Sequence, residues 1–463
     1  MHRLRGVFDL MPTDSEEAWA NIDARLAQVP AALEGYRATL RDEALHGWVA
    51  ARRQYVEVAA QVHAWADAHE GVGLFDDLVS GVDVRPTLDR CLGQHASAAT
   101  EALAVTARFL AEEMAPLGRQ RDAVGRDHYA LTSRYFLGST IDLDDTYAWG
   151  WEELHRISAE MGRTAREILP GAAGSDEIAV AEAVHALDAD PDRWIVSKDA
   201  FRGWMQDVSD QTVEQLDGVQ VDLPAAARRL ECCLAPTDDG GIYYTAPSED
   251  LARPGQMWWA VPPGQAAFSP WRELTTVHHE GVPGHHLQIA SALTSPHLNR
   301  WQRVLGGVSG HAEGWALYAE RLMDELGYLT DPAERLGMLD QQAYRAARVV
   351  VDIGIHLQLR VPENPFGFHP GERWTPALGL EFVRQLCRMD DAILRFELTR
   401  YLGWPGQAPS YKVGERLWLR GRAEAQATTG AAFDLRNFHR TALDLGPLGL
   451  DLVRDTVAAR VKT

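Results

Sequence analysis

The chain has 463 residues with 45 basic and 66 acidic side chains, so its formal net charge is −21. Hydrophobic residues make up 46% and charged residues 24% of the chain, which supplies a large buried core and excludes an intrinsically disordered protein. The acidic balance argues against nucleic acid and anionic membranes as partners, because most of the surface would repel them.

The N-terminal segment has no apolar run of signal-peptide length, and no stretch of about 18 apolar residues occurs anywhere in the chain. Four cysteines are too few and too scattered for a disulfide scaffold. The adjacent pair Cys232 and Cys233 could form a metal or redox site, but we interpret all four as ordinary buried thiols. We therefore expect a cytoplasmic protein with reduced cysteines.

Most of the chain has apolar residues three and four positions apart, which is typical of amphipathic helices. The first such run extends from Ser15 to about Leu45. Further helices are predicted near residues 97–116, 146–168, 175–187, 197–234, 271–282, 297–327, 333–360, 375–402, 410–430 and 446–461. Asp145 and Asp331 each precede one of these runs and are interpreted as N-caps, the second followed by proline in the first turn.

Strand-like sequence is confined to the middle of the chain. Residues 241–260 combine aromatic and β-branched residues with glycine and proline, which predicts short strands or an edge hairpin. We therefore predict a mainly α fold with a small β-hairpin element near residues 241–260. An N-terminal helical region is assigned to residues 1–140 and a helical catalytic region to 141–463, with one continuous domain as the alternative.

The sequence WRELTTVHHEGVPGHHLQIA places His278, His279, Glu280, His285 and His286 close together on a helix-like apolar background. Neutral imidazoles bind zinc well, and an adjacent carboxylate can take a proton from water, as in the zinc-protease sequence H-E-x-x-H. The cluster therefore predicts a metal site. The alternatives are histidines with ordinary hydrogen bonds and a metal site without catalysis.

The spacing of these histidines does not suit a regular helix. Six residues turn through about 600°, so His279 and His285 would lie on different faces, while His279 and His286 would be about 10 Å apart along the axis. Pro283 cannot donate to the carbonyl of His279, so the helix must bulge, kink or restart around Pro283 and Gly284. We favour His279 and His285 as ligands, with His286 as the rival for the second position.

The next predicted helix has the sequence GHAEGWALYAERLMDELG and offers Glu313 as a third ligand. The small residues Gly314 and Ala316 follow it closely. Small residues beside Glu313 would let two helices pack closely around an ion. A site with three protein ligands leaves one position for water. Glu320 is two turns further along the same face, so we expect it to support a ligand rather than bind the ion.

Polar residues recur every four positions in DQQAYRAARVVVDIGIHLQLR, namely Tyr344, Arg348, Asp352 and His356. This spacing places them in one stripe on a helix. The stripe either forms an internal ion pair between Arg348 and Asp352 or lines a cleft, where Arg348 and His356 would bind substrate. His311 could line the same cleft.

A turn rich in proline and glycine precedes Tyr411 and Lys412 at the head of another predicted helix. A phenol can stabilise an oxyanion, and an ammonium can hold a substrate carboxylate. A lysine early in a helix is disfavoured by the helix dipole and needs an anionic partner. Only Lys198, Lys412 and Lys462 are lysines, which draws attention to this position. The alternative is a tyrosine packed on the turn beside a solvated lysine.

Six segments together resemble a bacterial family of unknown function, numbered 885 among such domains, which is related to helical zinc peptidases of the gluzincin type. They are YYTAPSEDLARPGQ, HHEGVPGHHLQ, EGWALYAERL, RVVVDIGIH, WPGQAPSYKVG and FDLRNFHRTALDLGPL. The resemblance covers residues 130–463 well and the N-terminal helices loosely. The chain departs from the family at Gly281, Val282 and Pro409, and none of these is a candidate catalytic group.

This resemblance implies a large multi-helix, two-lobed, gluzincin-like fold with a central cleft and one Zn²⁺ ion. It implies His279, His285 and Glu313 as metal ligands and Glu280 as general base. We therefore expect a zinc-dependent metallopeptidase acting on short peptides, with Tyr411 stabilising the oxyanion. Arg348, His356, Lys412 and His286 are the candidate substrate-binding residues. The alternatives are a zinc amidase or esterase acting on a small non-peptide substrate, and a non-catalytic helical binding protein.

Overall fold

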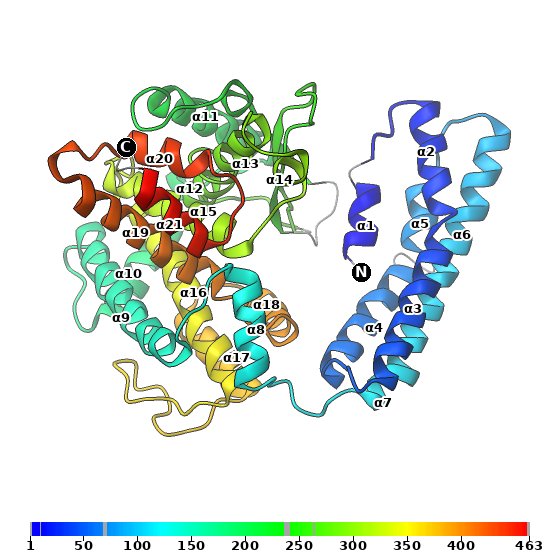
Figure 1. Cartoon of the computed structure of the whole chain (residues 1–463), viewed down its shortest axis with the longest axis horizontal. Helices are drawn as coiled ribbons and strands as arrows, with labels where there is room; N and C mark the ends of the chain where they lie inside the picture. The colour runs from blue at the N-terminus through cyan, green and yellow to red at the C-terminus, as the bar shows by residue number, and fades with distance from the viewer. Residues whose placement is uncertain (1, 10, 68–71, 236–240, 263, 461–463) are drawn as a thin grey trace. The chain divides into compact units, whose positions relative to one another are not determined.

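The chain forms two compact units, Met1–Ala123 and Val124–Thr463 (Figure 1). The computed structural model describes residues 2–9, 11–67, 72–235, 241–262 and 264–460. The boundary lies before the helix Arg126–Leu137 (α8), not near residue 140. Two hydrogen bonds join the start of the second unit to its helix Pro332–Leu357 (α16). Gly125 N donates to His356 O at 3.0 Å, and Tyr129 Oη donates to Asp352 Oδ2 at 2.6 Å.

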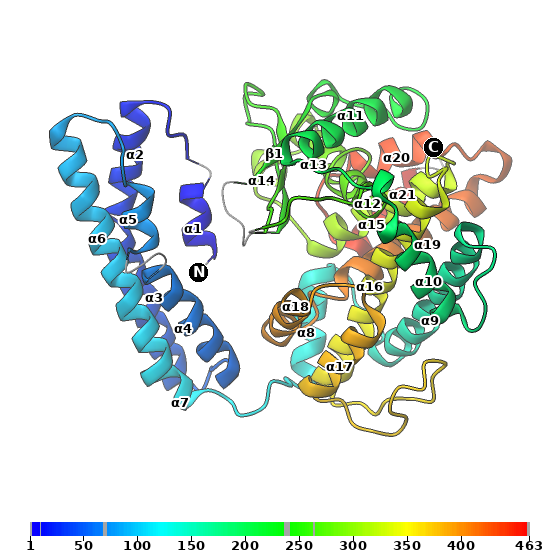
Figure 2. The ribbon, with the colours of Figure 1, turned by 180° about the vertical axis from the view of Figure 1, so that it is seen from behind.

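The first unit is a bundle of helices, visible from both sides in Figures 1 and 2. Its helices are α1 (His2–Asp9), α2 (Glu16–Leu26), α3 (Val29–Leu45), α4 (Arg52–Ala66), α5 (Leu74–Leu78), α6 (Pro86–Phe109) and α7 (Ala115–Leu117). The predicted helix from Ser15 to Leu45 is interrupted because α3 starts anew at Val29 with a proline in its first turn. Ile22, Leu26 and Leu103 are fully buried in the core of this bundle.

The second unit contains most of the predicted helices. They are α8, α9 (Leu143–Ile168), α10 (Asp176–Ala189), α11 (Lys198–Leu216), α12 (Pro270–Glu280), α13 (His285–Thr294), α14 (Arg300–Val304), α15 (Ser309–Glu325), α16 (Pro332–Leu357), α17 (Pro376–Leu386), α18 (Asp391–Gly403), α19 (Ser410–Thr429), α20 (Leu435–Leu443) and α21 (Leu450–Arg460). Helix α16 packs against α9, α12, α15, α17 and α19. Most of its residues are buried, including the charged Arg348 and Asp352, so it lies in the centre of the unit.

Three predicted boundaries were wrong. The run 297–327 is two helices separated at Gly306 and Gly307, and the run 375–402 divides into α17 and α18. Helix α9 is capped by Asp142, whose side chain accepts from two backbone N–H groups, and not by Asp145. Asp331 does cap α16, as predicted, with Pro332 in the first turn.

The second unit also contains a three-stranded sheet of β1 (Leu230–Leu234), β2 (Ile242–Thr245) and β3 (Gly255–Trp259). The strand order is β1-β3-β2, with β1 parallel and β2 antiparallel to β3. The predicted hairpin is therefore present as β2 and β3. The predicted helix over 197–234 is present only as α11, which ends at Leu216, and Leu230–Leu234 instead form β1 and pair with β3.

No helix among the described residues combines the length and apolar character needed to cross a membrane. The four cysteines are free thiols.

Candidate metal centre

The histidine segment breaks at the predicted place. Helix α12 ends at Glu280 and α13 begins at His285, after a Gly281–Gly284 connection that contains a cis Val282–Pro283 bond. A Cβ atom at Gly284 would lie 2.0 Å from the carbonyl oxygen of His279, so only glycine fits this close approach. The new helix brings His285 beside His279, with ring centroids 4.8 Å apart and planes at 87°.

His279, His285 and Glu313 converge on one point, each from a different helix. One ligand atom from each residue lies within 4.8 Å of the others. The Nε2 atoms of both histidines are 3.5 Å from Glu313 Oε2. Two imidazole nitrogens and one carboxylate oxygen fit the donor set of a catalytic zinc site, in which a fourth position stays open.

The ionisable side chains of this cluster strongly shift one another's pKa values. Burial by itself would raise the pKa of Glu313, but hydrogen bonds from His279 and His285 hold it far below its ordinary value. Burial would lower the pKa of His279, yet its bonds to Glu313 and Glu320 raise it to about 10. The carboxylate is therefore ionised, as a metal ligand must be.

Glu320 contacts the ligand His279 on the side away from Glu313, as the helical spacing predicted. Its Oε1 atom is 2.7 Å from His279 Nδ1, and its Oε2 atom accepts a hydrogen bond from Thr275 Oγ1 at 2.9 Å. A carboxylate on Nδ1 directs the lone pair of Nε2 towards the other two ligands and increases the basicity of the imidazole. Glu320 is 1% exposed, so this arrangement is shielded from water.

Replacing Glu320 with Gln is expected to weaken zinc binding about 10- to 100-fold, because the amide supplies no charge to the imidazole. Competition with a chromophoric chelator measures this change. Glu325→Gln is the matched control, since Glu325 lies on the same helix, is partly exposed and pairs with Arg422. Equal zinc affinity in the two variants would contradict the supporting role of Glu320.

Close packing of α15 against α19 places Tyr411 at the same centre. A Cβ atom on Gly314 would lie 2.5 Å from the backbone of Gly414, so the helices approach each other closely, as the small residues predicted. The Tyr411 ring stacks near His279, with centroids 6.5 Å apart and planes at 18°. Burial and the Glu313 carboxylate raise the pKa of Tyr411 to about 12, so the phenol is a proton donor at neutral pH.

Glu280 is buried at the end of α12, directly after His279. Within the described part of the chain, no protein group forms a hydrogen bond with its carboxylate. Burial raises the pKa of Tyr244 in β2, and the negative charge of Glu280 adds to that rise. Tyr244 was missed by the sequence analysis, because only the pairing of β2 with β3 places it beside α13.

His286 does not belong to the group of candidate ligands formed by His279, His285 and Glu313. It is fully buried, and its Nδ1 atom lies 2.8 Å from Tyr244 Oη, while a Cβ atom on Gly255 would lie 2.6 Å from the same nitrogen. One residue turns a helix by about 100°, so His286 faces the sheet when His285 faces Glu313. The structure therefore separates His286 from the three candidate metal ligands, and its substrate-binding role stays a prediction.

Lys412 is also absent from the cluster, although it follows Tyr411. Its side chain is 2% exposed, and its Nζ atom lies 3.0 Å from Glu153 Oε1 and donates to Glu415 and Gln342. The anionic partner that the helix dipole requires is present, but it belongs to the core. Lys412 thus faces Glu153 and Glu415 and not the candidate ligands, and its substrate-binding role stays a prediction.

The polar stripe on α16 is buried and turned towards α8 and α18. Arg348 pairs with Glu397, with Nη2 and Oε2 2.8 Å apart, and not with Asp352. Asp352 instead accepts from Tyr129 and from the backbone N–H of Gly406. His356 is fully buried and its Nε2 atom is 3.1 Å from Tyr401 O. Its contact with substrate stays a prediction.

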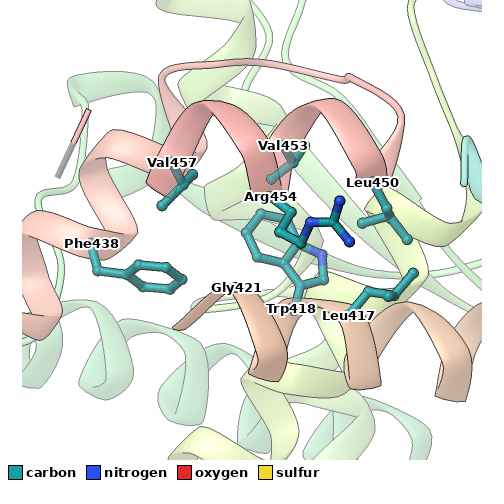
Figure 3. Close-up of a pocket in the computed structure, with 8 residues that line it drawn as sticks. All are labelled: Leu417, Trp418, Gly421, Phe438, Leu450, Val453, Arg454 and Val457. Atoms are coloured by element: carbon teal, nitrogen blue, oxygen red, sulfur yellow. The ribbon is translucent and has the colours of Figure 1, made fainter. Parts of the chain in front are cut away.

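Two other features do not contribute to this centre. His311 is buried, with Nδ1 3.1 Å from Gln288 Nε2, and does not line a cleft. An apolar pocket lies beneath the C-terminal helix α21, between α19 and α20 (Figure 3). Its lining residues are Leu417, Trp418, Gly421, Phe438, Leu450, Val453, Arg454 and Val457. None of them is a member of the metal cluster.

These observations define a mainly helical protein with a buried cluster of two histidines and one glutamate. The chain belongs to the family described as "Bacterial protein of unknown function (DUF885)", whose model matches residues 1–457. No protein in the curated set matches the chain.

Two solved structures share the fold. The crystal structure of a "putative lipoprotein" from Colwellia psychrerythraea has a TM-score of 0.83 and 23% identity, covering 99% of this chain and 78% of that one. A "putative lipoprotein of unknown function" from Shewanella oneidensis has a TM-score of 0.68 and 18% identity, covering 97% of this chain and 80% of that one. At these identities the likeness concerns the fold alone.

Proposed function

We propose that this protein is a zinc-dependent metallopeptidase of the gluzincin type that hydrolyses short peptides. The observation that carries the proposal is the convergence of His279, His285 and Glu313 within 4.8 Å, beside the buried carboxylate of Glu280. Three protein ligands and an adjacent free carboxylate are the groups that a zinc hydrolase needs.

Each residue has a distinct part in the proposed reaction. His279, His285 and Glu313 would hold the zinc ion, which supplies Lewis-acid polarisation and makes water more acidic. Glu280 accepts a proton from the attacking water and donates it to the leaving amine. Tyr411 donates a hydrogen bond from its hydroxyl to the oxyanion of the substrate carbonyl, where its raised pKa keeps it protonated.

Elemental analysis of the purified protein tests the proposal most directly. After supplementation we expect one zinc ion per chain, together with hydrolysis of short peptides. His279→Ala is expected to lose both, because two ligands without the third rarely hold zinc. His185→Ala, at an exposed position on α10, is the matched control.

Substoichiometric metal in the supplemented protein, or full zinc content in His279→Ala, would refute the metal centre and favour the binding-protein alternative. Stoichiometric zinc without peptide hydrolysis would instead direct the search to small amides and esters. Circular dichroism of the variant separates metal loss from unfolding.

A further inference from the structure

Three arginines, Arg345, Arg348 and Arg400, are close enough to Tyr411 for their charges to act on its phenol. The Cζ atom of Arg348 lies 4.7 Å from the Tyr411 ring centroid, and that of Arg345 lies 6.0 Å from it. Arg348 and Arg400 both bind Glu397, at 2.8 and 2.7 Å. One carboxylate is therefore shared by two guanidinium groups.

Arg345 is the arginine in this group that has no carboxylate partner among the described residues. It is half-buried, its Nη1 atom donates to Gln341, and its buried Nε–H has no acceptor. Two acids lie near enough to interact with its charge, but both are engaged. Glu320 accepts from His279 and Thr275, and Asp340 pairs with Arg388 at 3.0 Å.

Arg348 also has N–H groups that lack a hydrogen-bond acceptor. Its Nε and Nη1 atoms are buried and have no hydrogen-bond acceptor within the described part of the chain, although Nη2 binds Glu397. Buried polar groups without partners cost free energy, and a buried cation costs more. An anion placed beside these two arginines would supply the missing acceptors, and a guanidinium matches a carboxylate in shape and charge.

We propose that Arg345, together with the free edge of Arg348, binds the C-terminal carboxylate of the substrate, so that the enzyme acts on short peptides from their carboxyl end. This inference rests on the proposed function. Tyr411 links the two places, because its ring stacks near His279 and lies 6.0 Å from the Arg345 guanidinium. An extended residue spans about 3.5 Å, so the carboxylate lies about three residues or fewer from the scissile bond.

Binding of a peptide pair to the zinc-loaded Glu280→Gln protein tests this assignment without turnover. The pair is tetra-alanine as the free acid and as the C-terminal amide, measured by calorimetry. We expect the amide to bind about 10- to 100-fold more weakly, which is the effect of losing a charge-assisted hydrogen-bonded pair. Adding Arg345→Gln should remove most of this preference by weakening the free acid, because only Arg348 remains to bind the carboxylate, and should leave the amide unchanged.

The control is Arg420→Gln, which removes the same charge from an exposed position on α19 and should preserve the preference for the acid. Arg345→Lys keeps the charge but not the planar fork, so it should retain part of the preference even where Arg345→Gln folds poorly. Equal binding of acid and amide, or an unchanged preference in Arg345→Gln, overturns the inference and leaves the proposed function intact. Failure of both peptides to bind the zinc-loaded protein overturns the inference and the proposed function together.

Discussion

Glu280→Gln is expected to lower kcat for peptide hydrolysis by about 1,000-fold, while zinc content and KM stay near their original values. The amide has the size of the carboxylate but cannot accept the proton of the attacking water. Glu280 is outside the set of three ligands, and no described protein group forms a hydrogen bond with it, so the change should break no structural contact. Metal analysis and steady-state kinetics on the same preparation measure the two effects separately.

Two outcomes would contradict this role. Full activity with zinc retained would mean that Glu280 is not the base. Loss of zinc would mean that it holds the metal instead of moving a proton. Glu325→Gln, an uncharged replacement on the partly exposed face of α15, should retain both zinc and activity.

Lys412→Met is expected to destabilise the protein by about 3–5 kcal/mol, because it leaves buried carboxylates without their cation. Lys412 lies between Glu153 and Glu415, and all three side chains are largely buried. Despite its burial, hydrogen bonds from Arg156 and the charge of Lys412 hold the pKa of Glu153 at about 2. Methionine fills a similar volume, so the loss reports on charge more than on packing.

Denaturant titration followed by tryptophan fluorescence measures this change in the free energy of unfolding. Lys198→Met is the matched control, because Lys198 is exposed at the start of α11 and should change stability by less than about 0.5 kcal/mol. The double variant Lys412→Met, Glu415→Gln should recover part of the loss, since it removes one of the unpaired charges. A loss no larger than that of Lys198→Met would refute the structural role of Lys412.

Local stereochemistry made the centre of the site predictable. Pro283 and Gly284 require a helix to end, and the restart returns His285 to the side of His279. Glu320 could be placed because it is two turns from Glu313 on the same helix. These relations depend on residues within one or two helical turns of each other, where backbone geometry allows few solutions.

Relations between distant elements were not predictable in this way. The strand β1 was interpreted as helix, because its pairing partner β3 lies 25 residues later and leaves no trace in the local pattern. The partner of Arg348 was expected one turn away at Asp352, but it is Glu397 on α18. Arg345 was passed over entirely, since nothing in its neighbourhood along the chain marks it as unpaired.

The sequence by itself determined the mainly helical class, the position of the helix break and the identities of the converging histidines and glutamate. Only the tertiary structure decided which way neighbouring side chains face. Tyr411 faces His279 and Lys412 faces a buried ion network, while His285 faces Glu313 and His286 faces the sheet. The physical reason is that adjacent helical residues differ by about 100° in direction, and the packing of other elements decides which of them borders the site.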